Sequence, residues 1–232
     1  MLKGVYTFEI EELWISAIVD EEHVVLVDAG YPDYEDRILE GMKAAGIDPE
    51  KLSHIIITHH DEDHIGSLRA ISDRFPKAVI LTSEIEKPYV LGEKKAIRLA
   101  EADEAKDLSP EDKAYFDMVR AIRKVEHVEV VKGGDVLPVC GGIEIIETPG
   151  HMPGHISVYV PAEKCLIPGD AISCSADGKL FADPAYALDL PESVRSVQKL
   201  LQYDIAEVRC YHGGIFRGDV KAALEELIRE QG

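Results

Sequence analysis

The feature that most constrains the fold is a dense run of ionisable residues directly after an apolar segment. Residues 53–58 read Ser-His-Ile-Ile-Ile-Thr, which predicts a buried strand, and residues 59–64 follow as His-His-Asp-Glu-Asp-His. Imidazoles and carboxylates bind divalent metals in proteins, and loops at strand ends commonly carry functional groups. We therefore expect a metal site at the end of this strand, in preference to a solvated polar turn.

Distant strand ends supply the further ligands that a site for two metals needs. Residues 148–155 (Thr-Pro-Gly-His-Met-Pro-Gly-His), Gly169-Asp170 and His212-Gly213-Gly214 each follow an apolar, strand-like run. In each case a His or Asp lies beside glycines, which allow tight turns. The pattern predicts that loops from separate parts of the chain meet around one site.

The two halves of the chain follow a similar plan. In each half a strand ends on an Asp, namely Asp28 or Asp170, a helix follows, and a later strand ends on a His, namely His59 or His212. This order indicates an internal duplication whose two sheets pack face to face. Helices are predicted at about 33–45, 191–201 and 220–230, from their periodicity and end signals.

Between the halves lies a segment, about 83–127, that is rich in Glu, Lys, Ala and Leu. It predicts two or three helices broken near Pro88 and near Ser109-Pro110. Ser109 has the character of a helix N-cap, with Pro110 at the first helical position and acidic residues in the first turn. We expect this segment to form a helical insert beside the site and to cap it.

These motifs, in this order, resemble those of the metallo-β-lactamase superfamily. The central Thr-His-x-His-x-Asp-His pattern of the family matches residues 58–64, except that Asp61 stands where the second His is expected. The later Thr-Pro-Gly-His, Gly-Asp and His-Gly motifs fall at His151, Asp170 and His212. The resemblance implies an α/β fold, a four-layer αββα sandwich, that forms one domain over 1–232.

The resemblance also implies a role for each matched residue. The first metal would be bound by His59, Asp61 and His151, the second by Asp63, His64 and His212, and Asp170 would bridge both. Asp63 would also act in catalysis by orienting a hydroxide held between the metals, and Asp28 would support the ligands without touching a metal. The expected cofactors are two divalent ions, with zinc favoured. Iron or manganese is the alternative, because the Asp61 carboxylate is a harder ligand than imidazole.

Three polar residues near these motifs are not expected to be metal ligands. His60 lies between two ligands at a position that varies in the family, so we expect it to be a bystander. His155 follows a Pro-Gly turn and is expected to pack or to form hydrogen bonds. Glu62 is expected to face solvent.

The function implied is hydrolysis of a small ester, lactone or thioester by the metal-bridging hydroxide. Members of the lactonase type have a Tyr three residues after the bridging Asp, where this chain has Ser173, so Tyr89 or Tyr186 is the candidate oxyanion donor. The basic substrate-binding residues of glutathione thioesterases are not identifiable. Two alternatives stay open, a phosphodiesterase and a non-hydrolytic di-iron protein that handles oxygen. The second resembles the flavodiiron branch, which has Glu at the position of Asp61.

Charge and composition bear on partners. The chain has 44 acidic and 25 basic residues, a formal net charge of −19, which disfavours binding to nucleic acid. No apolar run reaches the roughly 18 residues that a membrane span needs. Residues 1–9 have no signal-peptide character, which predicts a cytoplasmic protein. The expected partner is a small-molecule substrate. The sequence leaves the oligomeric state open, a homodimer included.

Overall fold

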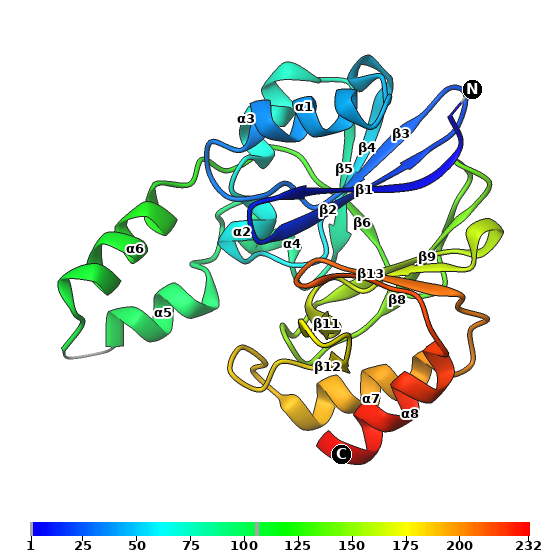
Figure 1. Cartoon of the computed structure of the whole chain (residues 1–232). Coiled ribbons are helices and arrows are strands. Elements are labelled where there is room, and N and C mark those ends of the chain that lie inside the picture. Colours follow the sequence, from blue (N-terminus) through cyan, green and yellow to red (C-terminus); the bar gives the residue numbers. More distant parts are fainter. Residues whose placement is uncertain (1, 105–106) are drawn as a thin grey trace.

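The computed structural model describes residues 2–104 and 107–232 and has four layers (Figure 1). Helices α1 (Glu35–Ala44) and α3 (Leu68–Arg74) cover one sheet, and helices α7 (Leu190–Leu200) and α8 (Val220–Gln231) cover the other. The two sheets pack against each other in the middle. This arrangement confirms the predicted αββα sandwich.

The first sheet contains six strands in chain order. They are β1 (Gly4–Ile10), β2 (Leu13–Val19), β3 (Val24–Val27), β4 (Leu52–Ile56), β5 (Val79–Ser83) and β6 (Glu129–Val131). Strands β1 to β3 are antiparallel, whereas β3 to β6 are parallel. Since parallel strands end at the same edge of a sheet, Asp28 after β3 and His59 after β4 lie together there.

The second sheet also contains six strands, in the order β14-β13-β10-β9-β8-β7. They are β7 (Val136–Leu137), β8 (Ile143–Glu147), β9 (Ile156–Val160), β10 (Cys165–Ile167), β13 (Glu207–Cys210) and β14 (Gly214–Phe216). Strands β10 and β13 are parallel, so Asp170 and His212 follow them at one edge. His151 lies in the turn between β8 and β9. Strands β11 (Ser173–Cys174) and β12 (Leu180–Phe181) form a separate small ladder.

Three apolar clusters hold the layers together. The central cluster joins the inner faces of the two sheets, with Ile18, Val27 and Ile56 from the first and Ile145, Val158 and Ile167 from the second. The outer clusters pack α1 and α3 on the first sheet and α7 and α8 on the second. Most of these strands are buried on both faces, which explains why they are apolar along nearly their whole length.

The two sheets are also linked through the backbone next to the ligand-bearing loops. Trp14 N donates to the carbonyl of Tyr211 at 2.8 Å, and Leu13 forms an isolated β-bridge with His212. This link fixes the end of β13 against β2. It therefore sets where His212 lies relative to the loops of the first sheet.

The remaining helices are short or belong to the insert. They are α2 (Glu62–Ile65), α4 (Lys87–Val90), α5 (Ile97–Glu104), α6 (Pro110–Ala121) and the 3-10 turns Pro49–Lys51, Pro161–Glu163 and Gly169–Ala171. Ser109 caps α6 as expected, because its hydroxyl accepts from Asp112 N at 3.0 Å. Pro88 lies in the first turn of α4, so a helix begins near the position where a break between helices was expected. No helix in the described part of the chain is long and apolar enough to cross a bilayer.

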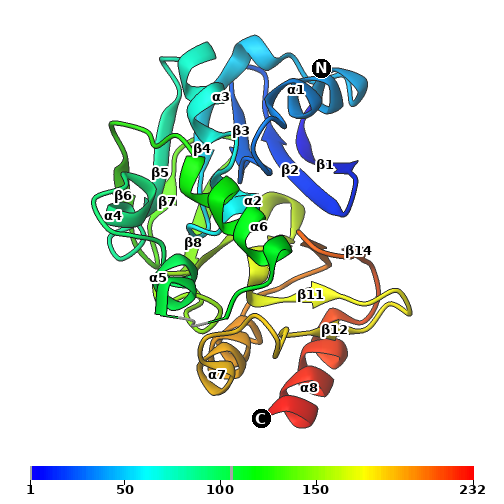
Figure 2. The ribbon, with the colours of Figure 1, turned by 90° about the vertical axis from the view of Figure 1, so that its left-hand side faces the viewer.

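Helices α5 and α6 stand out from the sandwich on one side (Figure 1), and a view from that side shows them in front of the sheet ends (Figure 2). The insert thus lies over the edge where the ligand-bearing loops gather. Its position agrees with the expectation that it caps the site.

Candidate metal centre

The central loop is held by Asp28 at the end of β3. Asp28 has a left-handed backbone, with φ of 64°, and its buried carboxylate accepts from Thr58 N at 2.8 Å and from Thr58 Oγ1 at 2.9 Å. The other contact of this carboxylate is His64 Nδ1, at 2.9 Å. One side chain therefore fixes both ends of the loop from Thr58 to His64.

The first cluster of candidate ligands joins the central loop to the β8–β9 turn. The Oδ2 atom of Asp61 lies 3.2 Å from His151 Nε2 and 3.5 Å from His59 Nε2. These three atoms are close enough to bind one ion. The structure thus brings together the three residues that the sequence assigned to the first metal.

The second cluster joins the central loop to the loop after β13. The Oδ2 atom of Asp63 lies 3.2 Å from His212 Nε2 and 3.5 Å from His64 Nε2. These three side chains also form a possible metal site. They are the residues that the sequence assigned to the second metal.

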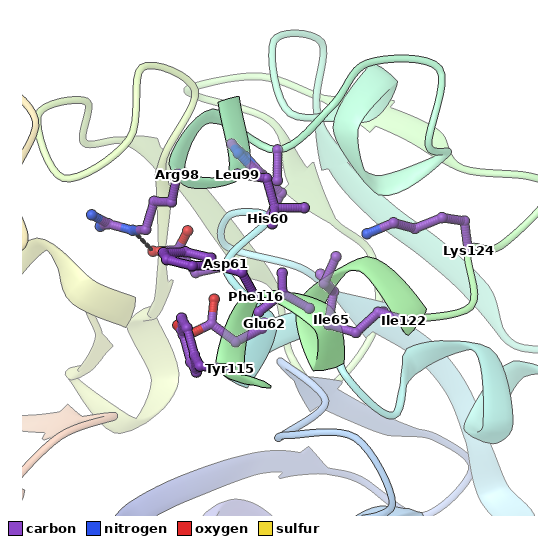
Figure 3. Close-up of a pocket in the computed structure, with 12 residues that line it drawn as sticks. His60, Asp61, Glu62, Ile65, Arg98, Leu99, Tyr115, Phe116, Ile122 and Lys124 are labelled. Atoms are coloured by element: carbon purple, nitrogen blue, oxygen red, sulfur yellow. Dashed lines mark hydrogen bonds and ion pairs between the residues drawn. The ribbon is translucent and has the colours of Figure 1, made fainter. Parts of the chain in front are cut away.

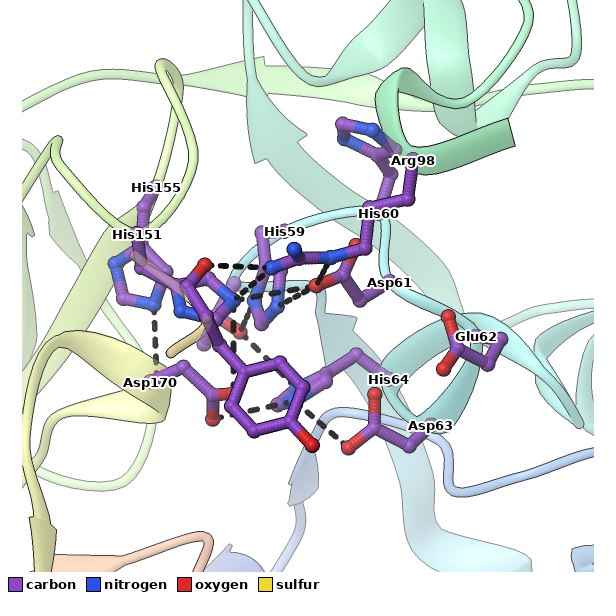
Figure 4. A network of polar contacts seen from close by, with 12 residues as sticks. His59, His60, Asp61, Glu62, Asp63, His64, Arg98, His151, His155 and Asp170 are labelled. Atoms are coloured by element: carbon purple, nitrogen blue, oxygen red, sulfur yellow. Dashed lines mark hydrogen bonds and ion pairs between the residues drawn. The ribbon is translucent and has the colours of Figure 1, made fainter. Parts of the chain in front are cut away.

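Asp170 faces ligands of both clusters, and Figure 4 shows it near His64 and His151. Its Oδ1 atom is 3.3 Å from His64 Nε2, and its Oδ2 atom is 3.4 Å from His212 Nε2 and 3.6 Å from His151 Nε2. The carboxylate therefore faces ligands of both clusters. Its position suits the bridging role that the sequence assigned to it.

The donor atoms fit divalent metal ions. His59 Nε2, His64 Nε2 and Asp170 Oδ1 are buried without a hydrogen-bond partner among the described residues. The opposite nitrogens are occupied, because His59 Nδ1 contacts Thr58 Oγ1 at 3.0 Å and His64 Nδ1 contacts Asp28. Proteins orient metal-binding imidazoles in this way, with Nδ1 anchored and Nε2 directed at the ion. The ligand roles of these residues stay predictions.

The electrostatics favour positive charge at the second cluster, whereas burial lowers the pKa of His59 in the first. Burial lowers the pKa of His212, but Asp170 and Asp63 outweigh it and raise this pKa to about 10. Burial likewise opposes ionisation of Asp170, yet His64 and His212 hold its pKa well below the ordinary value. Such a cluster of carboxylates and imidazoles binds protons when no metal is bound, and metal binding releases them.

His155 supports the centre by hydrogen bonds. Its Nε2 accepts from Asp170 N at 3.0 Å and its Nδ1 contacts Thr148 Oγ1 at 2.9 Å, so both nitrogens are engaged. Burial and the neighbouring His151 lower the pKa of His155 to about 3, which keeps the ring neutral. His155 therefore positions the Asp170 loop, in line with the expected hydrogen-bonding role.

An open cleft of about 760 Å³ leads to the two clusters. The insert contributes Arg98, Tyr115 and Phe116 to its wall, and the loop after β12 contributes Tyr186. Beneath the insert, residues of α5 and α6 and of the central loop line a small cavity of only about 10 Å³ (Figure 3). The insert is thus packed closely onto the loop that carries the ligands.

Two expectations about individual residues are corrected here. Tyr89 does not line the cleft, because its ring stacks on the buried ring of His60, with centroids 4.2 Å apart. Its neighbours Val90 and Leu91 join the apolar cluster of the first sheet. Glu62 does not simply face solvent, since its partly buried carboxylate accepts a hydrogen bond from Tyr115.

Arg98 and Tyr115 are cleft residues that the sequence did not reveal. Arg98 forms an ion pair with Asp61, and Tyr115 donates to Glu62. Nothing in the pattern of the insert distinguishes these two residues from its other charged and aromatic positions. Only the way in which the insert folds back onto the loop identifies them.

Comparison with known proteins agrees with this arrangement. Residues 14–212 match the profile of the family described as the Metallo-beta-lactamase superfamily. The chain belongs to this superfamily and is a metallo-hydrolase.

Individual relatives are distant. The chain is 29% identical to the probable metallo-hydrolase YflN of Bacillus subtilis, over 97% of this chain and 90% of that protein. It is 25% identical to a hydroxyacylglutathione hydrolase of Synechococcus, over 84% of this chain and 61% of that one. In fold it is similar to a metallo-beta-lactamase family protein from Thermus thermophilus, with a TM-score of 0.73, 21% identity and coverage of 98% of this chain and 79% of that one.

Proposed function

We propose that this chain hydrolyses a small carboxylic ester, lactone or thioester at a centre of two divalent ions, with zinc as the metal. The observation that carries this proposal is the position of Asp170 between two clusters at the base of an open cleft. Each cluster combines two imidazoles with one carboxylate, a donor set that suits zinc and also accepts iron or manganese. Two such ions, when bound, lower the pKa of a shared water and polarise the bond that it attacks.

The chain's own residues position the reacting groups. Asp63 is proposed to orient the attacking water, because its carboxylate lines the cleft beside His212. Its backbone is fixed by Tyr211, whose hydroxyl donates to the Asp63 carbonyl at 2.6 Å. Ser173 lines the cleft where lactonase-type relatives have Tyr, so an oxyanion donor must come from elsewhere in the wall. Of the two tyrosines considered from the sequence, Tyr186 is the proposed hydrogen-bond donor to the oxyanion, because it lines the cleft and Tyr89 does not.

The charge of the cleft restricts the substrate. Its acidic lining residues are Glu12, Asp61, Glu62, Asp63, Glu101, Asp170 and Asp183. Among the described lining residues, Arg98 carries the one guanidinium, and it is already paired with Asp61. Even after two divalent ions offset the carboxylates at the base, the outer wall stays acidic. A neutral or cationic acyl substrate fits this cleft better than a phosphodiester or an anionic thiol ester of the glutathione type.

The test uses protein purified without chelators. Metal analysis should find about two divalent ions per chain, as the two-metal chemistry requires. The protein should hydrolyse neutral nitrophenyl esters, lactones or simple thioesters and leave bis-nitrophenyl phosphate largely intact. Asp170→Ala should abolish turnover, whereas the remote surface variant Asp204→Asn should not change it. Preferred cleavage of the phosphodiester, or an iron centre with no hydrolysis of any acyl substrate, would refute the proposal.

A further inference from the structure

Arg98 reaches from the insert helix α5 into the first ligand cluster (Figure 4). Its Nε donates to Asp61 Oδ2 at 2.9 Å, which is the same oxygen that faces His59 and His151. Its Nη2 lies 3.4 Å from His151 Nε2. The guanidinium thus contacts the atoms that are directed toward the first metal.

The arginine is held in this position from two sides. Its Nη2 donates to the Tyr186 carbonyl at 2.8 Å, and the guanidinium lies 5.8 Å from the centre of the Tyr186 ring. The start of α5 is fixed by His60, whose Nε2 accepts from Ile97 N at 3.3 Å. The side chain is only 23% exposed. Contact with Asp61 is therefore built into the fold and is not a chance surface ion pair.

The two clusters have the same donor set. Each contains two imidazoles and one carboxylate, and both face Asp170. Within residues 2–104 and 107–232, no lysine or arginine forms an ion pair with Asp63, the carboxylate of the second cluster. Among the described residues, Arg98 is consequently the one lysine or arginine that pairs with a carboxylate of either cluster.

A positive charge at this distance weakens cation binding. The guanidinium engages a lone pair of Asp61 Oδ2 through its hydrogen bond, and it would repel a divalent ion bound to the same oxygen. Among the described residues, no lysine or arginine pairs with the carboxylate of the second cluster in this way. Asp63 and Asp170 would hold an ion there without a neighbouring guanidinium.

We propose that Arg98 makes the two metal sites unequal, so that the second cluster fills first and the first cluster binds its ion more weakly. The insert therefore sets the metal occupancy of the catalytic centre as well as covering it. This inference rests on the two-metal centre proposed above but on no particular substrate.

The experiment measures metal binding directly. Metal-stripped protein is titrated with Zn²⁺ and, separately, with Mn²⁺ in the presence of a chromophoric chelator. Wild type should bind two ions in separate steps. The step lost in Asp61→Asn should be the weaker one, and the step lost in Asp63→Asn should be the tighter one.

The decisive variant is Arg98→Met, which keeps the apolar stem and removes the charge. Its weaker step should tighten by about tenfold or more, while its tighter step changes little. The affinity of the weaker step in Arg98→Lys should lie between those of Arg98→Met and wild type. The matched control is Arg123→Met, because Arg123 forms a similar ion pair with Asp73, at 2.8 Å, on the exposed side of the insert. It should bind both ions as wild type does.

Three results would overturn the inference. They are equal affinities in wild type, a weaker step that is unchanged in Arg98→Met, and a weaker step that becomes still weaker because Arg98 orients Asp61 for the metal. Circular dichroism checks that Arg98→Met is folded, and Arg98→Gln gives an independent removal of the charge. A wild-type protein that binds no divalent ion would instead remove the proposed function itself.

Discussion

The carboxylate of Glu86 and the imidazole of His60 form a buried pair directly behind the candidate metal centre. Glu86 Oε2 also accepts from His60 N at 3.1 Å, and its Oε1 accepts from Gly154 N at 3.0 Å. Glu86 therefore fastens the loop of His59 to the loop of His151. His60, expected to be a bystander, is part of the framework that holds the ligands.

Removal of this pair should weaken both the fold and the first metal site. Glu86→Ala leaves the His60 ring and the Gly154 amide buried without their acceptor, a change that costs about 1–3 kcal/mol for each group left unsatisfied. Urea unfolding measures this loss, and a metal titration measures the accompanying fall in affinity. Glu84→Ala is the control, since Glu84 is exposed two residues away. An unfolding free energy within about 1 kcal/mol of wild type would contradict the assigned role.

Metal removal should lower stability in a reversible way. Both clusters draw ligands from the two halves of the sandwich, so bound ions stabilise the folded form selectively. At a free metal concentration about 100 times Kd, each independent site should add about 2.7 kcal/mol. Thermal unfolding before and after chelation, and again after zinc is restored, measures this effect. An unfolding midpoint that does not respond to metal in wild type would contradict it, and Asp170→Ala should show a reduced response.

Substrate selectivity should respond to Tyr115 and not to Tyr89. Tyr115 lines the cleft and donates to Glu62, whereas Tyr89 stacks behind the centre on His60. Tyr115→Phe should therefore change KM by several-fold, with a smaller change in kcat, because it alters a wall and not the reacting groups. Tyr89→Phe is the matched control and should leave both constants within about twofold of wild type. If, across a panel of esters and lactones, Tyr89→Phe changed KM and Tyr115→Phe did not, the assignment of Tyr115 to the wall of the cleft would be wrong.

The turn between β2 and β3 should give a pH-dependent contribution to stability. Burial opposes ionisation of Asp20, but hydrogen bonds from the backbone of Glu22, His23 and Cys140 outweigh it and lower its pKa from 3.8 to about 2. Since the pKa is lower in the folded chain, this stabilisation is full above about pH 4 and disappears as the pH falls toward 2.

Comparison of Asp20→Asn with wild type tests this contribution. The variant should lose about 1.5 kcal/mol of unfolding free energy at neutral pH, and the difference should shrink below pH 4. Glu21→Gln, an exposed neighbour, is the control and should show neither effect. A difference that stays constant between pH 6 and pH 3 would rule out Asp20 as the titrating group.

The grouping of the candidate ligands was predictable because these residues follow a rule of chain direction. Apolar strands end on Asp28, His59, Asp170 and His212, and parallel strands bring their carboxyl ends to one edge. The edge strand β1 was not predicted, because its side chains are partly exposed and its alternation is weak. The wall of the cleft was not predictable either. Arg98 meets Asp61 only because the insert folds back across 37 residues, which no local pattern reports.

The division of the ligands between the two halves determines when metals can bind during folding. Residues 59–64 contribute to both clusters, but the first lacks His151 and the second lacks His212 until the second sheet has docked. An ion at either cluster would therefore acquire its full ligand set late, once the sheets have come together, and it would then cross-link them. Interactions that form late slow unfolding more than they speed folding. The metals of this enzyme should accordingly prolong the lifetime of the folded chain without hastening its formation.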